Sequence, residues 1–434
     1  MAVVALVLLI ALVLLILLGV SIPFSLAGAS IIAVVIDRGI DAIPTSIAAQ
    51  RLVHGLNTFT WAAIPLFLLI GHLMNSGGVT ARIFRFAVAL VGHVRGGLGH
   101  VNVLASVIFS GMSGSASADA AGLGRILVKA MADAGYSRLY AATVTAASAT
   151  LGPILPPSIP AIVFAILAQQ SVLKIFIAAI VPGLLLAGIM MAMCTYYAIR
   201  DGYPTTERAK LPEIVASGRG AFWPMLTPIL LLLGMYSGFF TATEAAAVGA
   251  TYALMLVLVY GRRNLRQTMR NVFNDAEQTV IDAGIVLMII AMVGLYGWVL
   301  TRYQIPAYVL DQILLVTQNK WMILIFVNFL LILAGMFMAT TPSLLILVPI
   351  MLPVIDATGM DRTVFGLIMI LNLVMGSMTP PVGNVLIILS RVGEVPYEKL
   401  AWALVPWYIP FVVVIVLLAI FPDIALWLPH RLGF

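Results

Sequence analysis

Charged side chains are scarce in this sequence, and their scarcity decides the class of protein first. Asp, Glu, Lys and Arg make up only 9% of the 434 residues, whereas 62% of the residues are hydrophobic and the mean hydropathy is +1.12. A water-soluble domain carries about 25% charged residues. The composition therefore predicts an integral membrane protein.

Several functional classes are disfavoured by what the chain lacks. Cys194 is the only cysteine, so neither an intrachain disulfide nor a thiolate metal cluster can form. The five histidines have no metal-ligand spacing, and no phosphate-cradling loop is present, so we expect neither a transition metal nor ATP-driven pumping. The net charge of +6 comes from basic residues spread between apolar segments, which is typical of topology signals and not of nucleic-acid binding.

One pattern occurs twice, with its second copy 224 residues after the first. Gly111-Met112, Gly135, Arg138, Gly152 and Pro156-Pro157 reappear as Gly335-Met336, Gly359, Arg362, Gly376 and Pro380-Pro381. Glycine and proline interrupt helices, and a lipid bilayer offers no water to the freed backbone groups. Such breaks persist only where protein or a filled cavity covers them. Matched breaks in two halves point to the binding site of a transporter.

The apolar segments predict an all-α protein that crosses the membrane many times. Spans of adequate or nearly adequate length lie at 2–20, 22–37, 57–75, 174–199, 221–239, 242–260, 276–300 and 401–428. Arms too short to cross flank Ser113 to Ser117 and Phe337 to Pro342, which predicts two re-entrant hairpins. Each is followed by an apolar stretch with a break in its middle, which predicts two discontinuous helices.

If the hairpins do not cross, the first half has five spans, so the second half enters the membrane upside down and the repeat is inverted. Most basic residues then fall on the cytoplasmic side, as the positive-inside rule requires. The predicted first repeat, 1–200, contains an interfacial arm at 80–94, a hairpin at 99–134 and a broken helix at 138–170. A cytoplasmic linker follows at 201–220. The predicted second repeat, 221–434, contains an arm at 261–275, a hairpin at 321–356 and a broken helix at 362–392.

The two hairpin tips carry hydroxyls that suit a sodium ion. Ser113, Ser115 and Ser117 lie at the first tip, Thr340 and Thr341 at the second. Helix C-termini present carbonyls to a cation and helix N-termini present amides to an anionic substrate, so one such fold can hold sodium and an acid together. Small and hydroxylated residues also serve simply to pack membrane helices.

Three acidic residues are further candidates for a supporting role or for the substrate pathway. Asp119 opens the outgoing arm of the first hairpin, where its carboxylate would favour a sodium ion or stabilise the helix dipole. Glu244 and Asp282 lie in apolar segments, where a charge is costly. Such residues are either functional or held by a buried hydrogen bond.

An enzymatic alternative rests on Gly111-Met-Ser-Gly114, which has the Gly-x-Ser-Gly form of rhomboid intramembrane proteases. A serine nucleophile needs a base, and the only histidine after Ser113 is His430 near the end of the sequence. We therefore expect no enzyme.

Taken in order, several motifs of this chain resemble the large membrane subunit of tripartite ATP-independent periplasmic (TRAP) transporters. They are Gly92-His-Val-Arg-Gly-Gly-Leu-Gly-His100, Ser110-Gly-Met-Ser-Gly-Ser-Ala-Ser-Ala-Asp119, Leu151-Gly-Pro-Ile-Leu-Pro-Pro-Ser158, Phe240-Thr-Ala-Thr-Glu-Ala245 and Met378-Thr-Pro-Pro-Val-Gly383. The Thr-Ala-Thr-Glu segment lacks the proline expected after its first threonine.

The resemblance implies a sodium-driven, elevator-type importer of organic acids in the bacterial inner membrane. It implies two partners: a periplasmic substrate-binding protein and a separate small membrane subunit with four helices. It places one sodium ion at Ser113, Ser115, Ser117 and the carbonyls around Gly152 and Pro153. The second ion falls at Thr340, Thr341 and the carbonyls around Gly376 and Thr379. The rival within transport is an elevator symporter that needs no binding protein.

Overall fold

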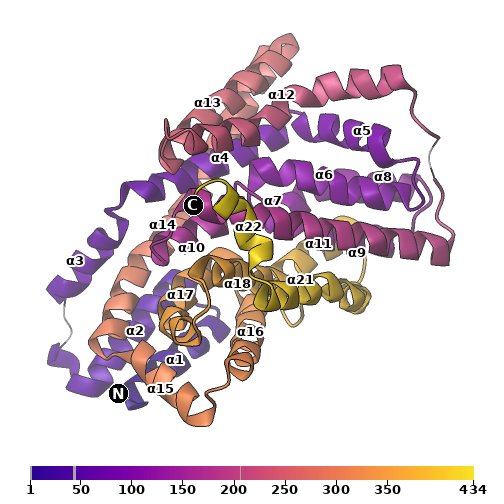
Figure 1. Cartoon of the computed structure of the whole chain (residues 1–434). Coiled ribbons are helices and arrows are strands. Elements are labelled where there is room, and N and C mark those ends of the chain that lie inside the picture. Colours follow the sequence, from indigo (N-terminus) through magenta and orange to yellow (C-terminus); the bar gives the residue numbers. More distant parts are fainter. Residues whose placement is uncertain (1, 43–44, 206) are drawn as a thin grey trace.

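The computed structural model describes residues 2–42, 45–205 and 207–434, and it is helical throughout, with no strand in those ranges (Figure 1). Eight of its helical segments are long and apolar enough to cross a membrane: 59–76, 172–201, 211–236, 242–260, 262–302, 320–337, 340–358 and 397–420. The predicted all-α membrane fold is confirmed.

The first half of the chain runs from α1 to α11. The helices before the first hairpin are α1 (Ala2–Leu17), α2 (Ile22–Arg38), α3 (Thr45–Leu56), α4 (Ala63–Ser76) and α5 (Val79–Val91). The hairpin and the helices after it are α6 (Gly97–Ser113), α7 (Ala116–Ala121), α8 (Leu123–Asp133), α9 (Arg138–Ala149), α10 (Ile159–Leu167) and α11 (Val172–Asp201). The first apolar stretch after the hairpin is therefore two short helices, α9 and α10, separated by residues 150–158.

The second half repeats this order. It begins with α12 (Leu211–Tyr236), α13 (Ala242–Tyr260), α14 (Leu265–Arg302) and α15 (Ile305–Val316). The hairpin and the interrupted helix are α16 (Lys320–Phe337), α17 (Thr340–Thr358), α18 (Arg362–Gly376) and α19 (Asn384–Gly393). The chain ends with α20 (Tyr397–Leu404), α21 (Ile409–Ile420) and α22 (Asp423–Arg431). The prolyl bonds 156–157 and 380–381 are both cis, at matched positions of the two breaks.

Three boundaries differ from the sequence-based expectation. Residues 265–275 are not a separate interfacial arm, because α14 continues unbroken to Arg302. Counted by the repeat distance, the counterpart of α5 is α15. Half of the expected linker 201–220 is helical, since α12 begins at Leu211; its residue 206 lies outside the described residues. The arms of the second hairpin, α16 and α17, have 18 and 19 residues, so their length alone does not prevent them from crossing.

Polar caps fix where the interrupted helices begin. Ser158 accepts a hydrogen bond from the Ala161 backbone N–H at 3.2 Å, and Pro160 follows at a first-turn position where its missing N–H has no cost. Asp361 caps α18 through the N–H groups of Thr363 and Val364. These caps satisfy backbone donors that neither lipid nor a continued helix would satisfy.

The helices form two groups that meet along a boundary. In one, which we call the scaffold group, α14 packs against α2, α3 and α4, and α13 packs against α4 and α12. Figure 1 shows α14 beside α2 and α3, far apart in sequence. The other group, which we call the hairpin group, contains both hairpins and both interrupted helices. Within it α10 packs on α17 and α7 packs on α19, two contacts that the repeat relates to each other.

The interrupted helices are the most buried part of the protein. Every residue of α18 from Thr363 to Gly376 is buried, whereas α12 buries only a few of its side chains. Each hairpin is tied to its own interrupted helix by buried amides. Asn102 of α6 donates to Thr145 of α9 at 2.7 Å, and Asn372 of α18 donates to Asn328 of α16 at 2.6 Å. A helix that is apolar all round belongs in the centre of such a bundle.

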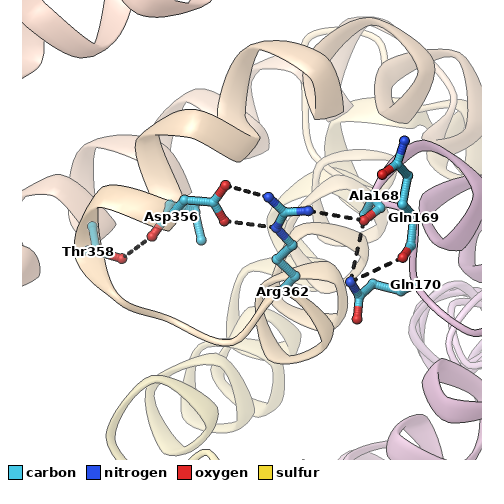
Figure 2. Close-up of polar contacts among 7 residues, drawn as sticks. Ala168, Gln169, Gln170, Asp356, Thr358 and Arg362 are labelled. Atoms are coloured by element: carbon cyan, nitrogen blue, oxygen red, sulfur yellow. Dashed lines mark hydrogen bonds and ion pairs between the residues drawn. The ribbon is translucent and has the colours of Figure 1, made fainter.

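Two arginines at matched positions bridge the halves. Arg362 donates to both carboxylate oxygens of Asp356, at 2.9 and 2.6 Å, and to the carbonyl of Ala168 at the end of α10, at 3.4 Å (Figure 2). Arg138, its counterpart, forms an ion pair with Glu394 at the end of α19. Each arginine thus joins the start of one interrupted helix to the end of the other.

Candidate functional site

A single cavity of about 440 Å³ lies where the two helix groups meet. Both hairpin tips and both helix breaks reach it, together with one face of the scaffold helices α4 and α14. Its polar and ionisable lining consists of His72, Ser115, Ser117, Asp282, Thr340, Thr341, Ser377 and Asn384. The size falls in the range of pockets for small organic molecules.

Four helices begin at this cavity. Ala116 and Ser117 open α7, Thr340 and Thr341 open α17, Ile159 and Pro160 open α10, and Asn384 opens α19. The longer three, α10, α17 and α19, carry unpaired N–H groups and the positive end of a helix dipole toward the cavity. No Lys or Arg lines the cavity among the described residues, so these helix ends are its main source of positive potential.

The serines of the first tip have different positions. Ser115 and Ser117 line the cavity, and Ser115 also caps α7. Ser113 is 4% exposed and lies behind the cavity, where its hydroxyl donates to Asp119. The tip turns at Gly114, whose φ of +62° favours glycine. A β-carbon there would lie 3.1 Å from the Pro157 carbonyl oxygen of the first break.

Asp119 is the one buried carboxylate near the first tip. It is 1% exposed, and its Oδ2 has no hydrogen-bond partner within the protein. That oxygen faces Gly152, because a β-carbon built on Gly152 would collide with it. An unpaired buried carboxylate oxygen is expensive. The Ser113 hydroxyl, the free oxygen of Asp119 and the carbonyls released around Gly152 form an oxygen-rich pocket that fits a small monovalent cation.

The second tip is built differently. Thr340 and Thr341 line the cavity, but Gly376 packs against the backbone of Gly335 and Ile332. The Thr379 hydroxyl donates to the Met375 carbonyl at 2.8 Å. Of the residues predicted for the second ion, the two threonines reach the cavity, and Gly376 and Thr379 lie outside its lining. The first-site residue Pro153 also lines the cavity, and its carbonyl accepts from Ser158.

The scaffold wall of the cavity contains an ionisable pair. His72 Nε2 lies 3.3 Å from Asp282 Oδ2, and Asp282 Oδ1 accepts from Gln278 at 2.9 Å. Asp282 was a candidate from the sequence, whereas His72 and Asn384 were missed. The signal available for His72 was a histidine inside the apolar span 57–75.

Glu244 lies elsewhere. It caps the first turn of α13 in an exposed capping box, where its carboxylate accepts from the N–H and hydroxyl of Thr241, each at 2.8 Å. This position matches the hydrogen-bonding role that was the alternative to a functional one, and it is outside the cavity lining.

Ser113 is not arranged as a protease nucleophile. Its hydroxyl donates to a carboxylate, and no histidine contacts it among the described hydrogen bonds. A nucleophilic serine requires a base that is held in turn by a third group.

The helical bundle, its paired breaks and its one polar cavity at a boundary between two helix groups define a polytopic membrane transporter. The chain belongs to the DctM family: the model of the tripartite ATP-independent periplasmic transporter, DctM component, matches residues 9–424. It is therefore a large TRAP permease, a multi-pass protein of the bacterial inner membrane and not an enzyme.

Curated relatives agree with this family. The sialic acid TRAP transporter large permease protein SiaM of Vibrio cholerae is 41% identical over 384 residues, which cover 88% of this chain and 89% of that protein. The C4-dicarboxylate TRAP transporter large permease protein DctM of Pseudomonas aeruginosa is 38% identical over 386 residues, with 89% and 90% covered.

Solved structures agree on the fold alone. The YdaH transporter of Alcanivorax borkumensis superposes with a TM-score of 0.61 at 16% identity, covering 91% of this chain and 90% of that one. MtrF of Neisseria gonorrhoeae, from a class of antimetabolite efflux pumps, gives 0.55 at 13% identity, with 89% and 85% covered.

Proposed function

We propose that this permease couples the inward movement of sodium to the import of an organic acid. The observation that carries the proposal is the single cavity in which hydroxyl-bearing tips and three helix N-termini meet, with an unpaired buried carboxylate oxygen behind it. Hydroxyls and carbonyls suit a hard cation, and helix N-termini suit a carboxylate. Both ligands then bind within one small volume.

The first sodium ion would be held by the first tip and the first break. Its ligands would come from Ser113, Ser115, Ser117, the free oxygen of Asp119 and the carbonyls around Gly152 and Pro153. The second would use Thr340, Thr341 and the carbonyls around Gly376 and Thr379. Asp119 moves from a supporting candidate to a central one, because its Oδ2 is the buried polar atom at the first site that lacks a partner.

The acid would lie among the N-termini of α10, α17 and α19. The Vibrio and Pseudomonas relatives transport, by their names, sialic acid and C4-dicarboxylates, and both kinds carry a carboxylate. Hydroxyls of Ser117, Thr341 and Ser377 would bind further oxygens of the substrate. The lack of Lys and Arg in the lining keeps the site neutral enough to release the acid.

Transport would proceed by an elevator-like movement of the hairpin group against the scaffold group. The cavity lies on the boundary between them, and reciprocal contacts join both halves within the hairpin group, so it can move as one body. Two partners belong to the proposal, as family membership implies: a periplasmic binding protein that delivers the acid and a small membrane subunit that braces the scaffold.

The test is thermal unfolding of the full-length chain, purified with its small subunit, in sodium and in choline at equal ionic strength, with and without N-acetylneuraminate or succinate. A ligand that binds only the folded state at a hundredfold excess over its Kd stabilises by about 2.7 kcal/mol. We expect stabilisation by sodium and a further, sodium-dependent rise with one of the acids. Equal unfolding in both cations, with no effect of either acid, contradicts the proposal.

Uptake into proteoliposomes separates the main proposal from its rival. We expect uptake of the acid only when a sodium gradient and the binding protein are both present. Sodium-driven uptake without a binding protein would favour the simpler symporter.

A further inference from the structure

We propose that His72 and Asp282 together form a proton-binding site in the scaffold wall of the cavity, so that a proton is a third ligand linked to the acid. The inference rests on the proposed function, since it concerns the same cavity. It starts from the hydrogen bonds around the imidazole ring.

The surroundings of His72 Nδ1 require a proton on that nitrogen. Nδ1 lies 3.1 Å from the Thr279 hydroxyl oxygen and 3.4 Å from the Asp275 carbonyl oxygen. The Thr279 hydroxyl donates its own hydrogen to the same carbonyl, at 2.7 Å. Both neighbours therefore present acceptors to Nδ1, and only an N–H fits between them.

The other ring nitrogen then decides the charge of the pair. In a neutral ring with a protonated Nδ1, Nε2 carries a lone pair, and here it would face Asp282 Oδ2 at 3.3 Å. A lone pair opposite an ionised carboxylate is repulsive. The contact is favourable only when one more proton is present, on the imidazole or on the carboxyl group.

This pair is the ionisable part of the cavity lining among the described residues. With the extra proton its net charge is zero, and without it the wall carries one negative charge opposite the helix N-termini where the acid would bind. A negative wall opposes an anionic ligand. Proton binding and acid binding therefore favour each other, and the coupling is reciprocal.

Other charged groups near α4 and α14 are already engaged or point elsewhere. On α14 itself, Asp275 accepts from the Ser76 hydroxyl and is the nearest other carboxylate. The remainder, in order, are Glu244 in its capping box, His100 facing Arg95 and Thr195, Arg82 over the Tyr260 ring, Asp37 bound to Tyr303, and Asp356 bound to Arg362.

The first experiment measures the affinity of N-acetylneuraminate and of succinate at pH 6.0 and 8.5 in constant sodium, with the full-length chain and its small subunit. For the acid that binds, we expect about a tenfold loss of affinity at the higher pH, within the usual span of coupled ligands. Asp282→Asn should bind with an affinity that does not depend on pH. His72→Gln leaves a fixed carboxylate and should bind weakly at both values.

His54→Gln, an exposed histidine on α3, is the matched control and should behave as the parent protein. A parent protein whose affinity ignores pH, or an Asp282→Asn variant that keeps the pH dependence, overturns the proposal.

The second experiment needs no acid, so it separates a failure of this inference from a failure of the proposed function. In nitrogen-15 spectra of histidine-labelled protein at pH 6.0, the His72 signals are those that disappear in His72→Gln. We expect a protonated Nδ1, with or without a protonated Nε2. A neutral ring protonated only on Nε2 means that Thr279 donates to Nδ1, and it overturns the proposal even if an acid binds.

Discussion

The free carboxylate oxygen of Asp119 lies against Gly152, 33 residues further along the chain, in a position that a β-carbon on the glycine would occupy. The contact links the first hairpin to the first break and leaves a buried oxygen available for a cation. It also explains why this break carries a glycine.

The first prediction concerns this contact. Gly152→Ala should displace the Asp119 carboxylate and raise the sodium concentration for half-maximal thermal stabilisation at least tenfold, because both the carboxylate and the local carbonyls shift. Gly188→Ala is the control: no atom of the protein lies within 4 Å of the added methyl group on α11. Sodium titrations followed by thermal unfolding measure both. Equal sodium responses in the two variants would remove Asp119 and Gly152 from the site.

A second prediction concerns the hydroxyls of the tips. Ser117→Ala combined with Thr341→Ala should weaken sodium stabilisation several-fold while leaving the melting temperature in choline nearly unchanged, because both hydroxyls line the cavity and neither lies in the packed core. Ser237→Ala, at the exposed end of α12, is the control. The same titration decides, and an unaltered sodium midpoint in the double variant counts against the tips as ligands.

A third prediction concerns the acid. Asn384→Asp places a negative charge at the first residue of α19 inside the cavity and should reduce the affinity for the bound acid at least tenfold. Asn384→Ser keeps a polar group without the charge and should cost less. Isothermal titration in saturating sodium measures the change. Equal affinities for the two variants would move the acid away from this helix end.

A fourth prediction tests how the interrupted helices pack. A β-carbon on Gly366 of α18 would collide with the buried ring of Phe164 on α10, so Gly366→Ala should destabilise the protein by about 1–3 kcal/mol. Adding Phe164→Leu should recover part of that loss. Gly297→Ala, which meets no atom within 4 Å, is the control. Melting temperatures measure all three, and the absence of any rescue would mean that the ring is not the obstacle.

A fifth prediction concerns the clasp at the ends of the interrupted helices. Arg362→Lys loses the two-point contact with Asp356 and the bond to Ala168, and should destabilise the protein by about 1 kcal/mol, since the pair is partly exposed. Arg200→Lys, whose partner Asp201 is its neighbour in sequence, should change the melting temperature less. Equal changes in the two variants would show that the contact between the halves contributes nothing.

The sequence predicted those features of the site that local chemistry dictates. Glycines and prolines end helices wherever they occur, so the breaks at 150–158 and 377–383 and the tips at Ser115 and Thr340 were visible as interruptions in apolar segments. The distance of 224 residues showed which interruptions are equivalent, and scarce charge showed that the chain belongs in a bilayer.

The boundaries that the sequence misplaced have a common reason. Residues 265–302 alternate between polar and apolar composition, which suggested two elements, but a long helix tolerates both environments when its ends lie in different surroundings. In α3, between Thr45 and Leu56, no residue is buried, so no apolar run marked it.

Length, apolar composition and helix-breaking residues are properties of the chain itself, and they determined the membrane class, the repeat and the positions of the tips. Tertiary structure alone decided which side chains meet. His72 faces Asp282 across α4 and α14, Asp119 faces Gly152, and Arg138 reaches Glu394 from the other half. Such contacts depend on how helices far apart in sequence pack against one another, and no local pattern of residues records that packing.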